Sequence, residues 1–252
     1  MVGVPWYLSS HLPGALLIAH EVGHHIEDDC GLGSELKDRL ASVGLTEPRH
    51  AQWSKWLEEV IADVVASLSC GGAYLAVMLD ALAAAPAGGA GEDRYPSPRV
   101  RGEICRATVA FTGPPVANEV AIDGATLGEP SIADAEAPAV VEAILTGPYE
   151  KLGGKTLPEV LRSPTVDADA GANRLLAGYS SKLTDVRAVI SAAALAFLSD
   201  PKGYDDRLVG QCAIHEVLAL RPVGPRGLMV DRESRRKRDA AAGQSILRLL
   251  SS

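Results

Sequence analysis

Two histidines and a glutamate near the start of the sequence have the spacing HExxH: His20, Glu21 and His24, within LLIAHEVGHHIEDD (residues 16–29). In an α-helix, residues four positions apart share one face, so His20 and His24 could bind the same metal ion. Neutral imidazole is a common zinc ligand, and a glutamate beside the first histidine can take a proton from water at the metal. The alternative interpretation is a buried amphipathic helix whose histidines are satisfied by hydrogen bonds.

A third zinc ligand is expected from a second helix, WSKWLEEVIADVVASL, at residues 53–68. Its apolar residues recur at helical spacing, and Glu59 and Asp63, four positions apart, share one face. Two carboxylates on a largely apolar helix are costly to bury unless cationic groups meet them. Zinc could bind Glu59, and a ligand histidine could donate its outer N–H to Asp63, which would fix the tautomer of the histidine. The alternative is a stripe of surface acids.

Three segments together resemble the gluzincin class of zinc metallopeptidases: HEVGH (20–24), EEVIADVVA (58–66) and YPSPRVRGEI (95–104). The second segment resembles the ExxAD helix of the HtpX and CAAX-prenyl-protease family. The third resembles that family's HPsxxxRi segment, which opens a helix. The resemblance covers roughly residues 15–106 and implies a zincin-like helical core. It implies His20, His24 and Glu59 as zinc ligands, Glu21 as general base, and Asp63 as the partner of a ligand histidine.

Tyr95 stands where that family usually has histidine. Its hydroxyl could donate a hydrogen bond to an oxyanion that develops during catalysis, and the alternative is a plain packing role. Ser97 and Pro98 are typical of a helix start, as cap and first-turn residue. Three arginines nearby could bind a substrate carboxylate or simply lie on the surface: Arg94, Arg99 and Arg101.

The composition of the 252 residues, with only 4% aromatic residues, favours helices packed on helices. We therefore expect a mainly α fold with little or no sheet, although residues 2–8 could form one strand, interrupted by Pro5. Three regions are expected: a zincin-like metal-binding core at 1–111, an irregular connector at 112–136, and a helical region of unknown role at 137–252. Beyond the two helices above, the pattern predicts Val64–Leu79, Pro138–Leu145, Leu157–Leu161, Asp169–Leu176, Asp185–Leu198, Asp205–Leu220 and Arg235–Leu250.

Net charge and the number and spacing of cysteines indicate which partners and which cellular compartment to expect. A net charge of −8 argues against nucleic acid as a partner. The four cysteines form no CxxC pair, which indicates neither a disulfide framework nor a cysteine zinc site. No signal peptide is recognised, and the apolar run Val64–Leu79 is shorter than the roughly 20 residues of a membrane span. These features predict a cytoplasmic protein without a membrane span.

The function that these residues predict is hydrolysis of a peptide bond in a peptide or protein substrate, with zinc as cofactor. In this interpretation zinc activates a water molecule, and Glu21 takes its proton and passes it to the leaving amine. Sites of imidazole and carboxylate also accept other divalent ions. Two alternatives stay open: a zinc-binding regulatory or interaction protein with weak or no catalysis on the same fold, and a metal-free helical binding domain.

Overall fold

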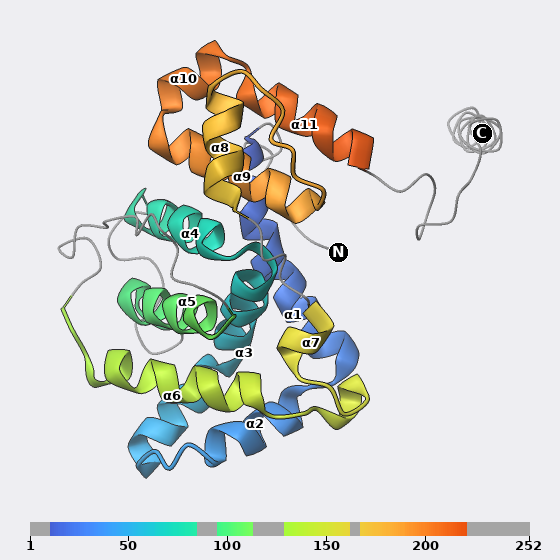
Figure 1. Ribbon diagram of the computed structural model, residues 1–252. Coiled ribbons are helices and arrows are strands. Elements are labelled where there is room, and N and C mark those ends of the chain that lie inside the picture. The colour runs from blue at the N-terminus through green and yellow to red at the C-terminus, as the bar shows by residue number, and fades with distance from the viewer. Residues whose placement is uncertain (1–10, 85–94, 113–128, 162–166, 221–252) are drawn as a thin grey trace, which may run out of the picture.

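Figure 1 shows the computed structural model of the chain, which describes residues 11–84, 95–112, 129–161 and 167–220. The described residues are mainly helical. Strand-like pairing within these ranges is limited to one isolated antiparallel bridge, between Tyr149 and Lys155. The predicted mainly α fold is thus confirmed. The predicted strand at 2–8 and the predicted helix Arg235–Leu250 lie outside the described residues.

The helices of the first half begin with a short 3-10 helix, η2 (Leu12–Leu17), which leads directly into α1 (Ile18–Cys30). They continue with α2 (Gly33–Ala41), α3 (Glu47–Cys70), α4 (Gly72–Ala84) and α5 (Pro98–Thr112). The second half contains α6 (Ile132–Thr146), η4 (Glu150–Leu152), α7 (Leu157–Leu161), α8 (Ala168–Leu176), α9 (Val186–Ser199), α10 (Pro201–Asp206) and α11 (Val209–Leu220).

Helix α3 is central because the second half of it is buried on every side. Residues 60–68 are all buried, and only Asp63 and Ser67 among them are polar. A helix that is apolar all round must be covered all round. Helices α1, α2, α4, α5 and α7 supply this cover by packing against α3. The helix that carries the expected third ligand is therefore held firmly by its neighbours.

Two apolar clusters lie on either side of the expected site. The first cluster joins α2, α3, α5, α6 and α7, with Trp53, Ile104 and Ile144 among its members. The second cluster joins η2 and α4 to helices α8–α11, with Leu16 and Val77 at the contact. Helices α8–α11 form the upper group in Figure 1, whereas α2 and α6 lie at the opposite end. Helix α1 begins next to the second cluster, where η2 ends, and its C-terminal residues Ile26 and Cys30 pack against the first cluster.

The predicted helix Val64–Leu79 is wrong as a single helix. Helix α3 ends at Cys70 and α4 begins at Gly72, while Gly71 between them has φ 62° and ψ −151°. Glycine adopts a positive φ without the steric cost that a side chain would bring, so the chain can change direction sharply here. The apolar run is thus shared between two core helices. None of the described helices has the length and apolar character needed to cross a membrane.

Two further helix boundaries differ from the prediction. The expected helix Asp205–Leu220 is divided into α10 and α11 at Leu208, which has φ 53°, and α10 begins earlier, at Pro201. Helix α6 begins at Ile132 rather than at Pro138 because Ser131 and Asp134 form a capping box. Helices α7, α8 and α9 confirm the predicted Leu157–Leu161, Asp169–Leu176 and Asp185–Leu198 to within one residue at each end.

Candidate metal centre

Helices α1 and α3 are in direct backbone contact at Gly23 and Ala62. A Cβ atom on Gly23 would lie 2.6 Å from Ala62 Cα and 3.0 Å from the Ala62 carbonyl oxygen. Carbon atoms pack at about 3.5–4.0 Å, so any side chain at this position would force the helices apart. Glycine costs about 1 kcal/mol of helix propensity relative to alanine. The close contact between the two helices accounts for a glycine inside HExxH.

This contact brings the three predicted metal ligands together. His20 and His24 lie one turn apart on α1 and face Glu59 on α3, and one donor atom from each residue lies within 4.8 Å of the others. His20 Nε2 is 3.2 Å from His24 Nε2 and 3.2 Å from Glu59 Oε2. His24 Nε2 is 3.6 Å from the other carboxylate oxygen, Glu59 Oε1. Three donor groups from two helices thus converge on one point.

The spacing of these donor atoms fits a zinc ion. Two ligand atoms bound to one tetrahedral zinc at the usual bond lengths are about 3.3 Å apart. His20 Nε2 lies at about this distance, 3.2 Å, from both His24 Nε2 and Glu59 Oε2, while His24 Nε2 lies 3.6 Å from the second carboxylate oxygen, Glu59 Oε1. Two imidazoles and one carboxylate also form one of the common ligand sets of catalytic zinc. In both chemistry and spacing, the residues fit the metal that the sequence predicts.

Asp63 fixes the orientation of the His20 ring. Its Oδ1 atom lies 2.9 Å from His20 Nδ1, and the Asp63 side chain is fully buried. The other ring nitrogen, Nε2, faces Glu59 and His24. A proton held on Nδ1 leaves Nε2 as the metal-binding atom, which is the arrangement seen where a carboxylate supports a zinc-bound histidine. The structure thus places Asp63 where the sequence predicts it.

Opposite charges balance one another across the site. Burial lowers the pKa of His20, but hydrogen bonds to Asp63 and Glu59 outweigh burial and raise this pKa to about 9. Burial raises the pKa of Asp63, but the hydrogen bonds and charge of Arg101 outweigh it and hold the pKa at about 2. Burial likewise opposes ionisation of Glu59, while His20 lowers its pKa. Asp63 and Glu59 are therefore both negatively charged at neutral pH, and His20 between them carries an extra proton. Binding of a zinc ion would displace that proton from His20.

Sequence reasoning missed two residues that support the site, Tyr74 on α4 and Arg101 on α5. Tyr74 donates its hydroxyl hydrogen to Asp63 Oδ1 at 2.6 Å. Arg101 donates from Nε to Asp63 Oδ2 at 2.7 Å and from Nη2 to Oδ1 at 2.6 Å. The expectation that Arg101 binds substrate or lies on the surface is therefore wrong. The available signal is that a buried Asp63 needs cationic partners, and a nearby arginine can supply this charge as well as zinc or histidine.

The two predicted catalytic residues lie nearer to solvent than the donor atoms do. Glu21 follows His20 on α1 and is exposed, as is Val22 beside it. Of the three donor side chains, His24 is the most exposed, at 32%, against 12% for His20 and 18% for Glu59. The site is thus most open at His24.

Tyr95 lies just before α5 and is 40% exposed. At the start of α5, the Val100 N–H donates to the Ser97 hydroxyl oxygen at 3.3 Å, which confirms the predicted Ser97 cap. The catalytic roles of Glu21 and Tyr95 stay predictions.

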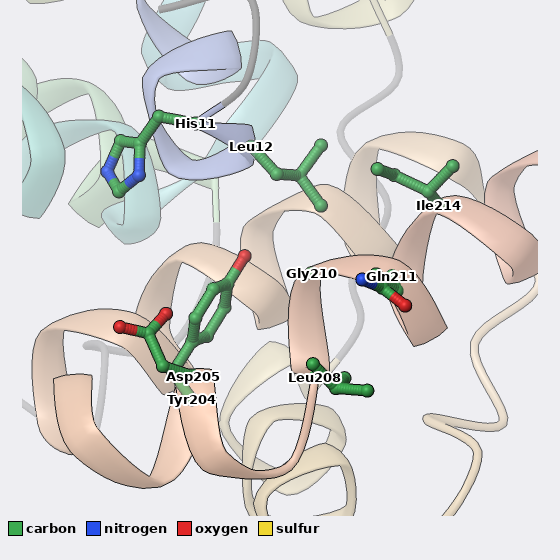
Figure 2. Close-up of a pocket in the computed structure, with 8 residues that line it drawn as sticks. All are labelled: His11, Leu12, Tyr204, Asp205, Leu208, Gly210, Gln211 and Ile214. Atoms are coloured by element: carbon green, nitrogen blue, oxygen red, sulfur yellow. The ribbon is translucent and has the colours of Figure 1, made fainter.

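A separate cavity of about 220 Å³ lies between the start of η2 and the junction of α10 and α11 (Figure 2). Its lining is partly polar, from His11, Asp205 and Gln211, and partly apolar, from Leu12 and Ile214. In Figure 2 the hydroxyl of Tyr204 points into the space between η2 and α11. None of the residues that line this cavity belongs to the donor group of His20, His24 and Glu59.

Comparison of the chain with protein-family models, with curated proteins and with solved structures found no match.

Proposed function

We propose that the chain is a zinc-dependent peptidase. The observation that supports this proposal best is the convergence of His20 Nε2, His24 Nε2 and the Glu59 carboxylate, whose two oxygens lie 3.2 and 3.6 Å from the two histidines. Three protein ligands leave a fourth position for water, as in catalytic zinc sites. The glutamate that a peptidase needs is present next to His20, as Glu21.

Each residue of the site has a distinct part in the proposed reaction. When bound, zinc would polarise the carbonyl of the scissile bond and lower the pKa of water. Glu21, exposed beside His20, takes a proton from the attacking water and passes it to the leaving amine. Asp63 holds the His20 ring so that Nε2 faces Glu59 and His24. The greater exposure of His24 indicates the side from which a substrate approaches.

A zinc-binding interaction protein is the second candidate. It is favoured by the all-helical packing around α1 and α3, because zinc peptidases of this kind usually bind the substrate backbone along the edge of a sheet. The two candidates make the same prediction for zinc binding and opposite predictions for cleavage. Glu21 separates them, since a purely structural zinc site needs no acid beside its first histidine.

The test combines metal content with peptide cleavage for the wild type and three variants. After incubation with zinc, the wild type should hold about one zinc per chain, His20→Ala should lose it, and Glu21→Gln should keep it. Cleavage of unstructured protein substrates should disappear in both of these variants. The matched control is His25→Ala, which removes a histidine of the same helix that is not part of the donor group.

The outcomes distinguish the candidates. A wild type that keeps zinc without cleaving, or cleavage that persists in Glu21→Gln, would favour the interaction protein or another general base. A wild type that stays free of metal in excess zinc would remove both candidates and leave a helical protein whose His20 is an ion-pair partner of Asp63 and Glu59.

A further inference from the structure

Asp63 receives four hydrogen bonds from three different helices. His20 on α1 and Tyr74 on α4 each bond to Oδ1, and Arg101 on α5 bonds to both oxygens. The carboxylate is fully buried, so water does not compete for these bonds. Each oxygen of a carboxylate has two lone pairs that can accept hydrogen bonds. In Asp63, Oδ1 accepts from His20, Tyr74 and Arg101, and Oδ2 accepts from Arg101. The orientation of this one side chain is therefore set by contacts outside its own helix.

Arg101 fixes the plane of the Asp63 carboxylate. Its Nε lies 2.7 Å from Oδ2 and its Nη2 lies 2.6 Å from Oδ1, which is a paired, two-oxygen contact. A guanidinium group that bonds both oxygens in parallel defines the direction of a carboxylate as well as neutralising its charge. Arg101 is itself largely buried, at 15% exposure. A lysine could supply the charge at this place but could not make the same paired contact.

Tyr74 approaches the same oxygen that holds His20. Its hydroxyl is 2.6 Å from Asp63 Oδ1 and 3.3 Å from His20 Nδ1, so it lies beside the bond between them. Tyr74 reaches this position because α4 starts in a new direction after Gly71. The residue is completely buried in a small apolar cluster with Met78, Leu79 and Cys105. Packing thus holds the ring while the hydroxyl contacts the site.

We propose that Tyr74 and Arg101 are positioning residues of the zinc site. They hold Asp63 in the orientation that keeps His20 Nδ1 occupied and turns Nε2 toward Glu59 and His24. The inference rests on the proposed zinc site and deepens it, because it assigns metal affinity to two residues that contact neither the metal nor the substrate. A role in stability alone would leave the orientation of His20 unaffected.

The experiment measures zinc affinity and the His20 ring in two conservative variants, Tyr74→Phe and Arg101→Lys. Zinc affinity is measured by competition with a chromophoric chelator, and the Nδ1 proton of His20 is followed by NMR in the metal-free protein. Both variants should weaken zinc binding by about 10-fold, the lower limit of the effect of losing the partner of a ligand, because the partner itself, Asp63, is kept. In both, the Nδ1 proton should exchange with water faster than in the wild type.

The matched control is Arg49→Lys, which disrupts another two-oxygen contact: Arg49 donates from Nε to Glu136 Oε1 at 3.1 Å and from Nη2 to Oε2 at 2.7 Å. This pair links α3 to α6 and contacts none of the three donor residues. Its loss should lower the unfolding temperature and leave zinc affinity within about twofold of the wild type, since distant sites act independently. Comparison of the three variants separates an effect on the site from an effect on the fold.

Wild-type zinc affinity in both Tyr74→Phe and Arg101→Lys would overturn the inference and leave the proposed function intact. A wild type that binds zinc without cleaving peptides would overturn the peptidase proposal alone. A wild type that takes up no zinc would overturn the proposed function and this inference together, and faster exchange of the Nδ1 proton in the variants would then show only that Tyr74 and Arg101 order His20 beside Asp63.

Discussion

Replacing Gly23 with alanine should separate metal binding from folding. The added Cβ would meet the backbone of Ala62 at 2.6 Å, and the backbone of a buried helix cannot turn aside as a side chain can. Restoring an ordinary contact of about 3.6 Å requires α1 to move roughly 1 Å away from α3. Because His20 and His24 move with α1 and Glu59 stays on α3, the movement acts directly on the donor atoms.

The structure gives the size of the effect. The two histidine–glutamate separations, 3.2 and 3.6 Å, would grow to roughly 4.2 and 4.6 Å, beyond the spacing of a tetrahedral zinc. Metal sites tolerate displacements of about 0.5 Å, so we expect zinc affinity to fall by about 100-fold or more. Overpacking should cost about 1–3 kcal/mol, offset by about 1 kcal/mol of helix propensity. The net loss of unfolding free energy is then no more than about 2 kcal/mol.

The assay is zinc competition beside urea unfolding at the same pH and salt. Gly102→Ala is the matched control, because Gly102 is also a buried helical glycine but its added Cβ would lie 3.5 Å from Leu79 Cδ2, an ordinary contact. This control should gain about 1 kcal/mol of stability and keep its zinc. Wild-type zinc affinity in Gly23→Ala would show that the close contact does not set the donor geometry.

Two further predictions concern stability. Burial raises the pKa of Glu136, but hydrogen bonds from Arg49 and Trp53 outweigh burial and lower this pKa below its usual value. The charged Glu136 therefore stabilises the fold above its unfolded-state pKa, and this stabilisation is lost as the pH falls through the lowered, folded-state pKa. Glu136→Gln should thus reduce the unfolding free energy by about 1–2 kcal/mol at pH 7 and by progressively less in acid, measured by urea unfolding across pH; an equal difference at all pH values would contradict the reasoning. Removing zinc with a chelator should lower the apparent unfolding free energy by about 2.7 kcal/mol relative to zinc at 100 times its dissociation constant. The helical circular-dichroism signal should stay at 25 °C, because the apolar clusters do not depend on the metal, and its collapse would argue against a preformed site.

The sequence was sufficient for the helices and donor residues whose signals are local. The spacing of His20 and His24 on one helix, and of Glu59 and Asp63 on another, follows from helical periodicity alone. The prediction that these two helices lie together rests on the need of the buried carboxylates for a cationic partner. In the structure His20 contacts both carboxylates, Glu59 and Asp63. These inferences worked because helix geometry and the cost of buried charge are independent of the rest of the fold.

Features that depend on distant segments were missed. Nothing local to Tyr74 or Arg101 indicates that α4 and α5 converge on Asp63, since these contacts span 11 and 38 residues of sequence. The break at Gly71 is not predicted, because an apolar run of this length has the same composition whether it forms one helix or two. The start of α6 differs because residues 112–136 are expected to form an irregular connector, whereas Ser131 and Asp134 form a capping box within it.

The second apolar cluster ties the helices of the second half to the start of the metal-binding helix. Leu16, in this cluster, is one helical turn before His20, and Ala73, in the same cluster, is next to Tyr74. Helices α8–α11 thus contribute no donor atom, yet they secure the chain just before the first ligand and just beside the tyrosine that contacts Asp63. Local opening of that cluster would release the first turn of α1. The lifetime of the assembled site should therefore depend on how rarely helices α8–α11 separate from η2 and α4.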